Sequence, residues 1–369
     1  MKISKYTIIA LLNLFIFSNA NSQEVSNNGN SEEVKIYVNA TLGNDSNAGK
    51  INSPLKSLSE AAKKVNALVG AGSINVIVSE GVYALNETAD FNPKNWNFSK
   101  KTRLLISAEV LPNDIQWEPS KMPIIVSAMP FNVEKNNEKE IIGGSNYGIL
   151  IQTSHTTIQG LRILGEPVHE TPKAGVLIRN YPIVWDGKEL SDLVVTQCLF
   201  LGNKFALPNH LGILANGSAL DVNHCVFYGV KDAVVMWNRK SENSQLHHNL
   251  FLNMYGAAVW TWSTTSDFKY YNNVASNVNV LWVLDKDEKE SFTVNNSILV
   301  GYNSFVNKGG GPQDFGTESK ANKIMFGKDL KIIKSGNLNI IEDQTNKNFL
   351  HIKEGTLGSE YGAGLFYNN

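Results

Sequence analysis

The feature that most restricts the fold of this chain is a repeat of about 24 residues in its central part. Each copy holds a short apolar segment bounded by Gly or Asn. Five successive copies begin at Phe200, Phe227, Phe251, Ala275 and Leu299, so the intervals are 27, 24, 24 and 24 residues. Strands of about five residues recurring at such a period predict a solenoid with one coil per repeat. Helical repeats would need longer runs with a 3.6-residue period, which are absent.

A second motif, a small residue followed by alternating apolar residues, lies between the copies of the first. It occurs at 148–152, 175–179, 212–216, 233–237 and 258–262, and 280–284 continues it without the small first residue. Side chains alternate across a strand, so the motif predicts which of them face inward. The two predicted inward columns are Ile149, Val176, Ile213, Val234, Val259 and Leu281, and Ile151, Ile178, Ala215, Met236, Thr261 and Val283. The two predicted outward columns are Leu150, Leu177, Leu214, Val235, Trp260 and Trp282, and Gln152, Arg179, Asn216, Trp237, Trp262 and Leu284.

The N-terminus is typical of a secretion signal. Lys2 and Lys5 precede an apolar stretch at 7–17, and small residues suited to signal cleavage follow it. We expect a signal peptide at 1–22, a disordered linker at 23–33 and a single domain at 34–369. The stretch is too short to span a bilayer comfortably, and no other long apolar run exists. The sequence therefore predicts a secreted or periplasmic protein without a membrane span.

The charge balance argues against general binding of nucleic acid. Lys and Arg number 33 and Asp and Glu number 34, whereas a nucleic-acid binder would normally carry a basic excess. We expect a monomer.

The ordered part should begin with a strand at 34–38, followed by a helix. Ser57 and Glu60 have the spacing of a capping box, and the apolar residues that follow fall on one helical face. Further strands are predicted at 74–78, 103–108 and 124–128.

One column of the repeat is small or polar. Its members are Cys198, Cys225, Asn249, Asn273 and Ser297. Stacked Asn side chains can bond to one another and to turn backbone from coil to coil. The two cysteines should lie about one strand spacing apart, roughly 4.8 Å. We expect buried free thiols there rather than a strained disulfide, and a metal site is the least favoured alternative.

Several segments resemble the pectin-lyase-like β-helix superfamily. Residues 37–49 and 53–58, with the helix after them, resemble its N-terminal cap. The segments 223–227, 248–251 and 295–299 resemble its coils, and 349–364 resembles its closing segment. The resemblance covers about 34–364 and implies an all-β, right-handed parallel β-helix with an N-terminal capping helix. The superfamily includes lyases, hydrolases, epimerases, esterases and non-catalytic adhesins, so the resemblance leaves the reaction open.

Four tryptophans fall in predicted outward positions on successive coils: Trp237, Trp260, Trp262 and Trp282. Exposed indoles of this kind suit stacking on the apolar faces of sugar rings. The alternative is that a loop or the C-terminal segment covers them. Asn216, Arg239 and Tyr255 lie near the same face and complete the predicted substrate-binding set.

Charged residues around this face suit two reactions on a polysaccharide. In a lyase acting on an acidic polymer, Arg179, Lys231 or Arg239 would neutralise the sugar carboxylate, with a calcium ion as the alternative. His210 or Lys231 would remove the C5 proton. In a glycoside hydrolase, Asp232 and Asp285 would supply the two carboxyl groups. We expect a polysaccharide-cleaving enzyme, with the lyase slightly favoured. A non-catalytic glycan-binding β-helix is the competing class.

A histidine pair provides the last candidate. His224 and His248 occupy matching positions in neighbouring coils, and His247 adjoins them. Stacking and turn bonding are favoured over a metal site because no carboxylate accompanies the histidines at matching positions.

Overall fold

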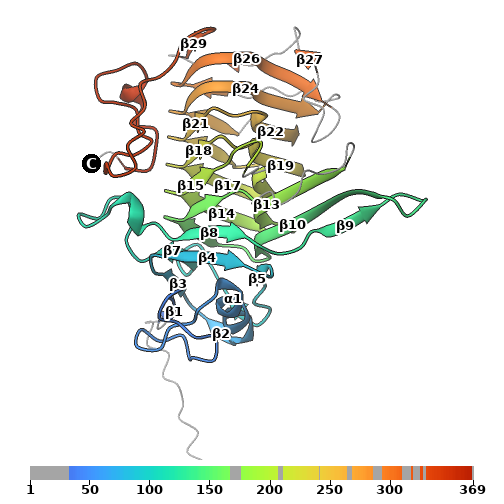
Figure 1. Ribbon diagram of the computed structural model, residues 1–369, viewed down its shortest axis with the longest axis vertical. Helices are drawn as coiled ribbons and strands as arrows, with labels where there is room; N and C mark the ends of the chain where they lie inside the picture. The colour runs from blue at the N-terminus through green and yellow to red at the C-terminus, as the bar shows by residue number, and fades with distance from the viewer. Residues whose placement is uncertain are drawn as a thin grey trace, which may run out of the picture. The chain divides into compact units, whose positions relative to one another are not determined.

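The computed structural model describes residues 33–166, 176–206, 211–240, 242–263, 268–285, 293–309, 317–318, 325–326 and 330–367. Within these ranges the fold is all-β and β-helix-like. Parallel strands from successive repeats pair with one another to form three ladders. Figure 1 shows the strands stacked coil on coil.

The first ladder is a ten-stranded sheet in which all neighbours are parallel. Its strands are β1 (Val34–Val38), β3 (Ile74–Val78), β7 (Leu104–Ala108), β11 (Thr156–Gln159), β14 (Ser191–Thr196), β17 (Ser218–Asn223), β20 (Gln245–His247), β23 (Lys269–Tyr271), β25 (Thr293–Asn295) and β28 (Met325–Phe326).

The second ladder follows the Phe200 motif and its relatives. Its strands are β4 (Val82–Leu85), β8 (Ile124–Ser127), β12 (Arg162–Leu164), β15 (Leu199–Leu201), β18 (Val226–Tyr228), β21 (Leu250–Leu252), the first parts of β24 (Val274–Asp285) and β26 (Ile298–Gly309), and β29 (Lys331–Ile333). The predicted 24-residue period is thus confirmed as the spacing between paired strands.

The third ladder contains the small-residue motif. Its strands are β5 (Ala89–Phe91), β10 (Ile141–Ile151), β13 (Leu177–Trp185), β16 (Leu211–Ala215), β19 (Asp232–Lys240), β22 (Ala257–Ser263) and the later parts of β24 and β26. Two antiparallel strands extend it, β9 (Asn132–Lys135) beside β10 and β27 (Thr317–Glu318) beside β26.

The other described elements are short. The helix α1 (Leu58–Ala67) packs on β5, β1 and β4. The short strands β2 (Gly70–Ala71) and β6 (Trp96–Asn97) pair with each other in parallel. The 3-10 helices η1 (Pro119–Lys121) and η2 (Ser359–Tyr361) complete the set. The Ser57 side chain accepts a hydrogen bond from the Glu60 backbone N–H at 3.2 Å, so the predicted helix start is confirmed. Among the described residues, no helix combines the length and apolar character needed to cross a bilayer.

The main core lies where the three ladders face one another. Phe200, Phe227 and Phe251 stack inside it, with ring centroids 4.6 and 5.3 Å apart. A separate apolar cluster lies between the outer side of the second ladder and the C-terminal segment, where Phe349, Leu350 and Tyr361 pack on the strands. Burying large side chains in stacked columns supplies most of the stabilisation in a fold of this kind.

The polar column of the repeat forms the predicted ladder. The Asn249 side-chain oxygen accepts from the Cys225 backbone N–H at 3.0 Å, and the Asn273 oxygen accepts from the Asn249 N–H at 2.9 Å. Each amide also donates to a carbonyl, Asn249 to Val222 and Asn273 to Leu246, both at 2.8 Å. Cys198 and Cys225 are buried free thiols, as expected. The coils that carry Cys225, Asn249, Asn273 and Ser297 are therefore joined by buried side-chain bonds as well as by strand pairing.

We predict that Asn273→Ala destabilises the protein by about 3 kcal/mol, because it leaves buried backbone groups without partners. Asn303→Ala is the matched control. Asn303 makes a similar amide bond to Asn279 at 2.9 Å, but on the surface, so the loss should stay within about 0.5 kcal/mol. Denaturant unfolding of both variants measures the difference, and equal losses would contradict the role of the buried ladder.

Candidate functional site

The outer face of the third ladder carries the candidate site. Three successive coils have a local irregularity there, because two adjacent residues of each point into the core: Ala233 and Val234, Ala258 and Val259, and Leu281 and Trp282. The side chains on either side of these pairs form an outer cluster that includes Leu211, Val235, Ala257, Trp260, Val280 and Val283. This arrangement decides which side chains can meet a ligand.

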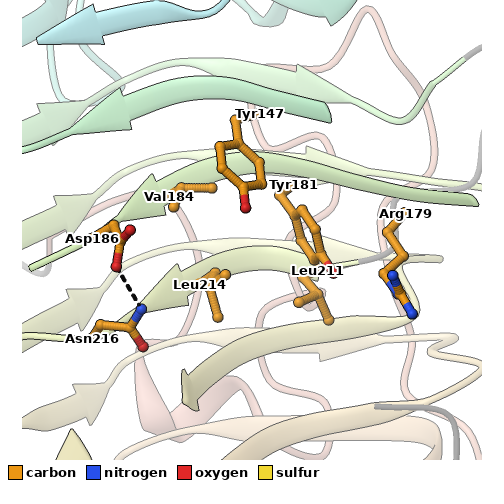
Figure 2. Close-up of a pocket in the computed structure, with 8 residues that line it drawn as sticks. All are labelled: Tyr147, Arg179, Tyr181, Val184, Asp186, Leu211, Leu214 and Asn216. Atoms are coloured by element: carbon orange, nitrogen blue, oxygen red, sulfur yellow. Dashed lines mark hydrogen bonds between the residues drawn. The ribbon is translucent and has the colours of Figure 1, made fainter. Parts of the chain in front are cut away.

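A cavity of about 490 Å³ opens on this face. It is lined by Tyr147, Arg179, Tyr181, Val184, Asp186, Leu211, Leu214 and Asn216. Figure 2 shows the rings of Tyr147 and Tyr181 next to each other, with Arg179 at one end and Asp186 and Asn216 at the other. The two rings have centroids 5.6 Å apart and are tilted by 58°. The volume and the mixed lining are in the range of small-ligand sites.

The two ends of the cavity differ in charge. Arg179 Nη1 donates to Glu134 Oε1 of β9 at 2.6 Å, and Asn216 Nδ2 donates to Asp186 Oδ1 at 2.9 Å. Two buried atoms of these lining residues, Arg179 Nε and Asn216 Oδ1, have no hydrogen-bond partner within the described part of the chain. A buried donor or acceptor without a hydrogen-bond partner lowers the stability of the fold unless a ligand supplies the missing partner.

A buried ion pair lies on the same outer face. Asp232 is paired in register with the lining residue Leu211, is fully covered, and its Oδ2 lies 4.0 Å from Lys231 Nζ. Its Oδ1 accepts from the Ala257 N–H at 2.8 Å and from Trp260 Nε1 at 3.1 Å. Burial raises the pKa of Asp232 to about 7 and lowers the pKa of Lys231. A carboxyl group with this pKa exchanges its proton near neutral pH, as acid–base catalysts do.

Two tyrosines beside this pair stay protonated. Burial raises the pKa of Tyr181 to about 12 and also raises that of Tyr255, on which the Asp232 charge acts in the same direction. Both phenols are therefore hydrogen-bond donors at neutral pH.

The structure brings several predicted site residues to one face and separates others. Arg179, Lys231, Asp232, Tyr255 and Asn216 all belong to the outer side of the third ladder or its edge. The predicted column that joined Arg179 to Asn216 is wrong, because the strand that pairs with β16 is the later part of β13 and Asp186 is the residue bonded to Asn216. Residues 181–185 are the later part of that strand, and Trp185 faces the core.

The predicted exposed tryptophans need correction. Trp282 pairs with Val259 instead of Trp260, so the strand is displaced by one residue and the indole is buried in the core against Phe268 and Tyr270. Trp260 does lie on the outer side, but it is only 2% exposed and its N–H is bonded to Asp232. Neither indole offers a surface to a sugar. Asp232, expected at the rim of the face, is likewise fully covered.

The other predicted site residues lie outside what the structure describes. His210 falls in an undescribed segment, and the side chains of Trp237, Arg239, Trp262 and Asp285 are not described. Their roles stay predictions.

Sequence reasoning missed most of the cavity lining. Tyr147 and Tyr181 pair with each other inside β10 and β13, and sequence reasoning missed Tyr181 because the repeat was aligned to 175–179 instead of 181–185. Glu134 was not foreseen because its strand, β9, lies outside the repeat.

Comparisons with known proteins give no family. No protein-family model and no curated protein matches the sequence. Among solved structures, the native GH136 lacto-N-biosidase from Eubacterium ramulus is similar over 81% of this chain and 68% of its own, with 12% identity and a TM-score of 0.44. Its selenomethionine derivative gives 11% identity, coverage of 82% and 68%, and a TM-score of 0.39. The complex of XylC with xylose gives 10% identity, coverage of 83% and 68%, and a TM-score of 0.37. At TM-scores this low, the likenesses carry no argument about activity.

We predict that Asp232 makes stability depend on pH. Its folded pKa is raised from 3.8 to about 7, so the stability present below pH 4 is lost as the pH rises through about 7. The full shift corresponds to about 4 kcal/mol, an upper bound for the effect. Asp232→Asn cannot ionise, so wild type should lose stability relative to this variant across that pH window. Unfolding free energies of both proteins at pH 4 to 8 measure the difference, and parallel curves would show that Asp232 is not perturbed.

Proposed function

We propose that this protein is a carbohydrate-active enzyme that cleaves an acidic polysaccharide on the outer face of the third ladder. One observation carries the proposal: a cavity with an unpaired buried donor and acceptor lies on the same sheet face as a carboxyl group whose pKa is about 7. We further propose that the scaffold is a right-handed parallel β-helix of the pectin-lyase-like kind, forming one domain from 34 to 369 after a cleaved signal peptide and a linker. The protein would then act as a monomer outside the cell or in the periplasm.

The cavity supplies contacts suited to a sugar acid. The rings of Tyr147 and Tyr181 present apolar faces to the C–H side of a pyranose. Arg179 would bind the carboxylate, since a guanidinium matches a carboxylate in geometry and charge. Asp186 and Asn216 would bind hydroxyl groups at the other end, where Asn216 Oδ1 can accept a hydrogen bond.

The favoured reaction is β-elimination. Arg179 neutralises the uronate carboxylate, which acidifies the C5 proton. The ionised Asp232 takes this proton, the C5–H electrons form the C4–C5 double bond, and the bond from C4 to the glycosidic oxygen breaks. The leaving oxygen then receives a proton from Asp232, and Lys231 stabilises the negative charge that develops. Because Asp232 is fully covered in this structure, the mechanism requires the outer face to open over it when substrate binds.

Hydrolysis is the second candidate, and the raised pKa of Asp232 supports it as well. A carboxyl group protonated near neutral pH is the general acid of glycosidases. A hydrolase also needs a second carboxylate at a fixed separation, for which Asp285 was the predicted residue. Arg179 at the cavity favours the lyase, because hydrolysis does not require the sugar carboxylate to be neutralised.

We predict cleavage of at least one uronic-acid polymer by the wild-type protein, with products that absorb as unsaturated sugars. Asp232→Asn should lower kcat on the order of 10²-fold or more, since it removes proton transfer. Arg179→Ala should lower kcat/KM by a similar factor on acidic polymers. A panel of uronic-acid, sulfated and neutral glycans, assayed by unsaturated product and by reducing ends, measures both effects.

Arg103→Ala is the control for these variants. Arg103 is an ion-paired, partly buried arginine bonded to Asp192 at 2.7 Å, but it lies on the first ladder. Its replacement should leave kcat/KM unchanged. Reducing ends without unsaturated products would identify a hydrolase, and a wild-type protein inert on the whole panel would leave glycan binding as the remaining function. The same assay in the presence of EDTA tests the alternative that a calcium ion neutralises the sugar carboxylate.

A further inference from the structure

A cluster of three histidines lies on the corner between the first and second ladders, away from the cavity. His224 is the residue directly after β17. In the next coil, His247 is the last residue of β20 and His248 is the residue after it. One ligand nitrogen from each of the three lies within 4.8 Å of the others. The predicted stacking of His224 on His248 is confirmed, with ring centroids 4.7 Å apart and an angle of 7°.

A carboxylate does reach these histidines, but from another position of the repeat, where Asp221 pairs in register with Gln245. Asp221 Oδ1 lies 3.2 Å from His247 Nε2. Asp221 also accepts from Asn223 at 2.8 Å and from Gln245 at 2.7 Å, so its position is fixed. Burial alone would raise the pKa of Asp221, but the hydrogen bonds from His247 and Asn223 hold it below its usual value. An ionised carboxylate only accepts, so His247 Nε2 carries a proton, and in the metal-binding form of the ring His247 Nδ1 presents a lone pair.

That lone pair points at a second imidazole. His247 Nδ1 and His248 Nδ1 are 2.8 Å apart, so a proton carried by one of them must lie between them. His248 Nε2 is bonded to the Asn272 amide at 2.9 Å, and Asn272 to Asn296 at 2.6 Å. Asn296 is exposed, so both amides can turn over together without leaving a buried group unpaired. His248 then carries its proton on Nε2, and its Nδ1 becomes a second free lone pair.

The surroundings keep His224 and His248 neutral, which is the form that binds metal. Burial lowers the pKa of His224 to about 3. Burial and, to a smaller extent, the neighbouring His247 lower the pKa of His248. A cluster of imidazole nitrogens backed by a carboxylate has the composition of a site for zinc, copper or nickel, whereas calcium and magnesium prefer oxygen.

We propose that His224, His247 and His248 bind a divalent transition-metal ion, with Asp221 orienting His247. Tetrahedral coordination at about 2.1 Å requires ligand nitrogens roughly 3.4 Å apart, so the two Nδ1 atoms must separate by about 0.6 Å. Ligand nitrogens as far apart as 4.8 Å must instead approach by about 1.4 Å. The ion joins two neighbouring coils. It also lies beside the C-terminal segment, because the Tyr367 ring is 4.2 Å from that of His224 and the Gly364 N–H donates to the His248 carbonyl at 2.9 Å. Binding therefore stabilises the corner on which the chain closes.

The experiment uses the full chain without a polyhistidine tag, with zinc as the probe. After dialysis against zinc and then buffer, elemental analysis should find about one zinc per chain, and zinc should raise Tm because it binds the folded state. Asp221→Asn should weaken zinc binding about 10- to 100-fold in competition titrations. His248→Asn should weaken it further.

The His248→Asn variant is expected to fold. His248 has φ 54°, a left-handed conformation that Asn tolerates, and Asn272 occupies the matching position in the next coil with the same φ. His155→Ala is the control, since His155 lies on another part of the first ladder beside Asp192. Absence of zinc from the wild type, or equal zinc in wild type and His248→Asn, overturns the proposal. Loss of zinc in His155→Ala as well would show binding elsewhere on the protein and overturn it too.

Discussion

The structure depends on the pairing of each coil with the next at a fixed register. Parallel strands supply backbone hydrogen bonds, and the Asn249–Asn273 ladder adds bonds between side chains and backbone at equivalent positions. Once this register is set, every side chain of a coil is placed directly over its counterpart. A displacement of one residue exchanges core and surface, as the position of Trp282 illustrates.

The same constraint creates the candidate site. In three successive coils of the third ladder two adjacent residues face the core, so the outer positions do not alternate simply with the inner ones. Asp232 takes the place that Leu211 and Ala257 hold in neighbouring coils, and it is therefore a carboxyl group among apolar side chains. Its perturbed pKa follows from that placement, with Lys231 opposing the shift. A carboxyl group with a shifted pKa thus arises where Asp replaces an apolar residue in a stacked column.

The cluster of His224, His247 and His248 also results from the stacking of equivalent positions. The turns after β14, β17, β20, β23 and β25 of the first ladder each contain a residue with positive φ, and these residues are Gln197, His224, His248, Asn272 and Asn296. Two adjacent coils use histidine, so the rings stack, and Asp221 lies one coil from His247. Stacking of coils therefore places chemistry-bearing residues together wherever neighbouring repeats share a residue type.

Much of the scaffold could be predicted from the sequence alone. The 24-residue period, the stacked Phe column, the Asn ladder, the free thiols and the capped helix are all local patterns that the chain repeats or carries within a few residues. The site could be predicted only in part, because Arg179, Lys231 and Asp232 were recognised by type and place but not by burial or partner. The tertiary structure decided which indoles are covered and which tyrosines line a cavity. It also decided that Asp221 contacts His247. These outcomes depend on a register shift of one residue and on contacts between different coils, which no local pattern records.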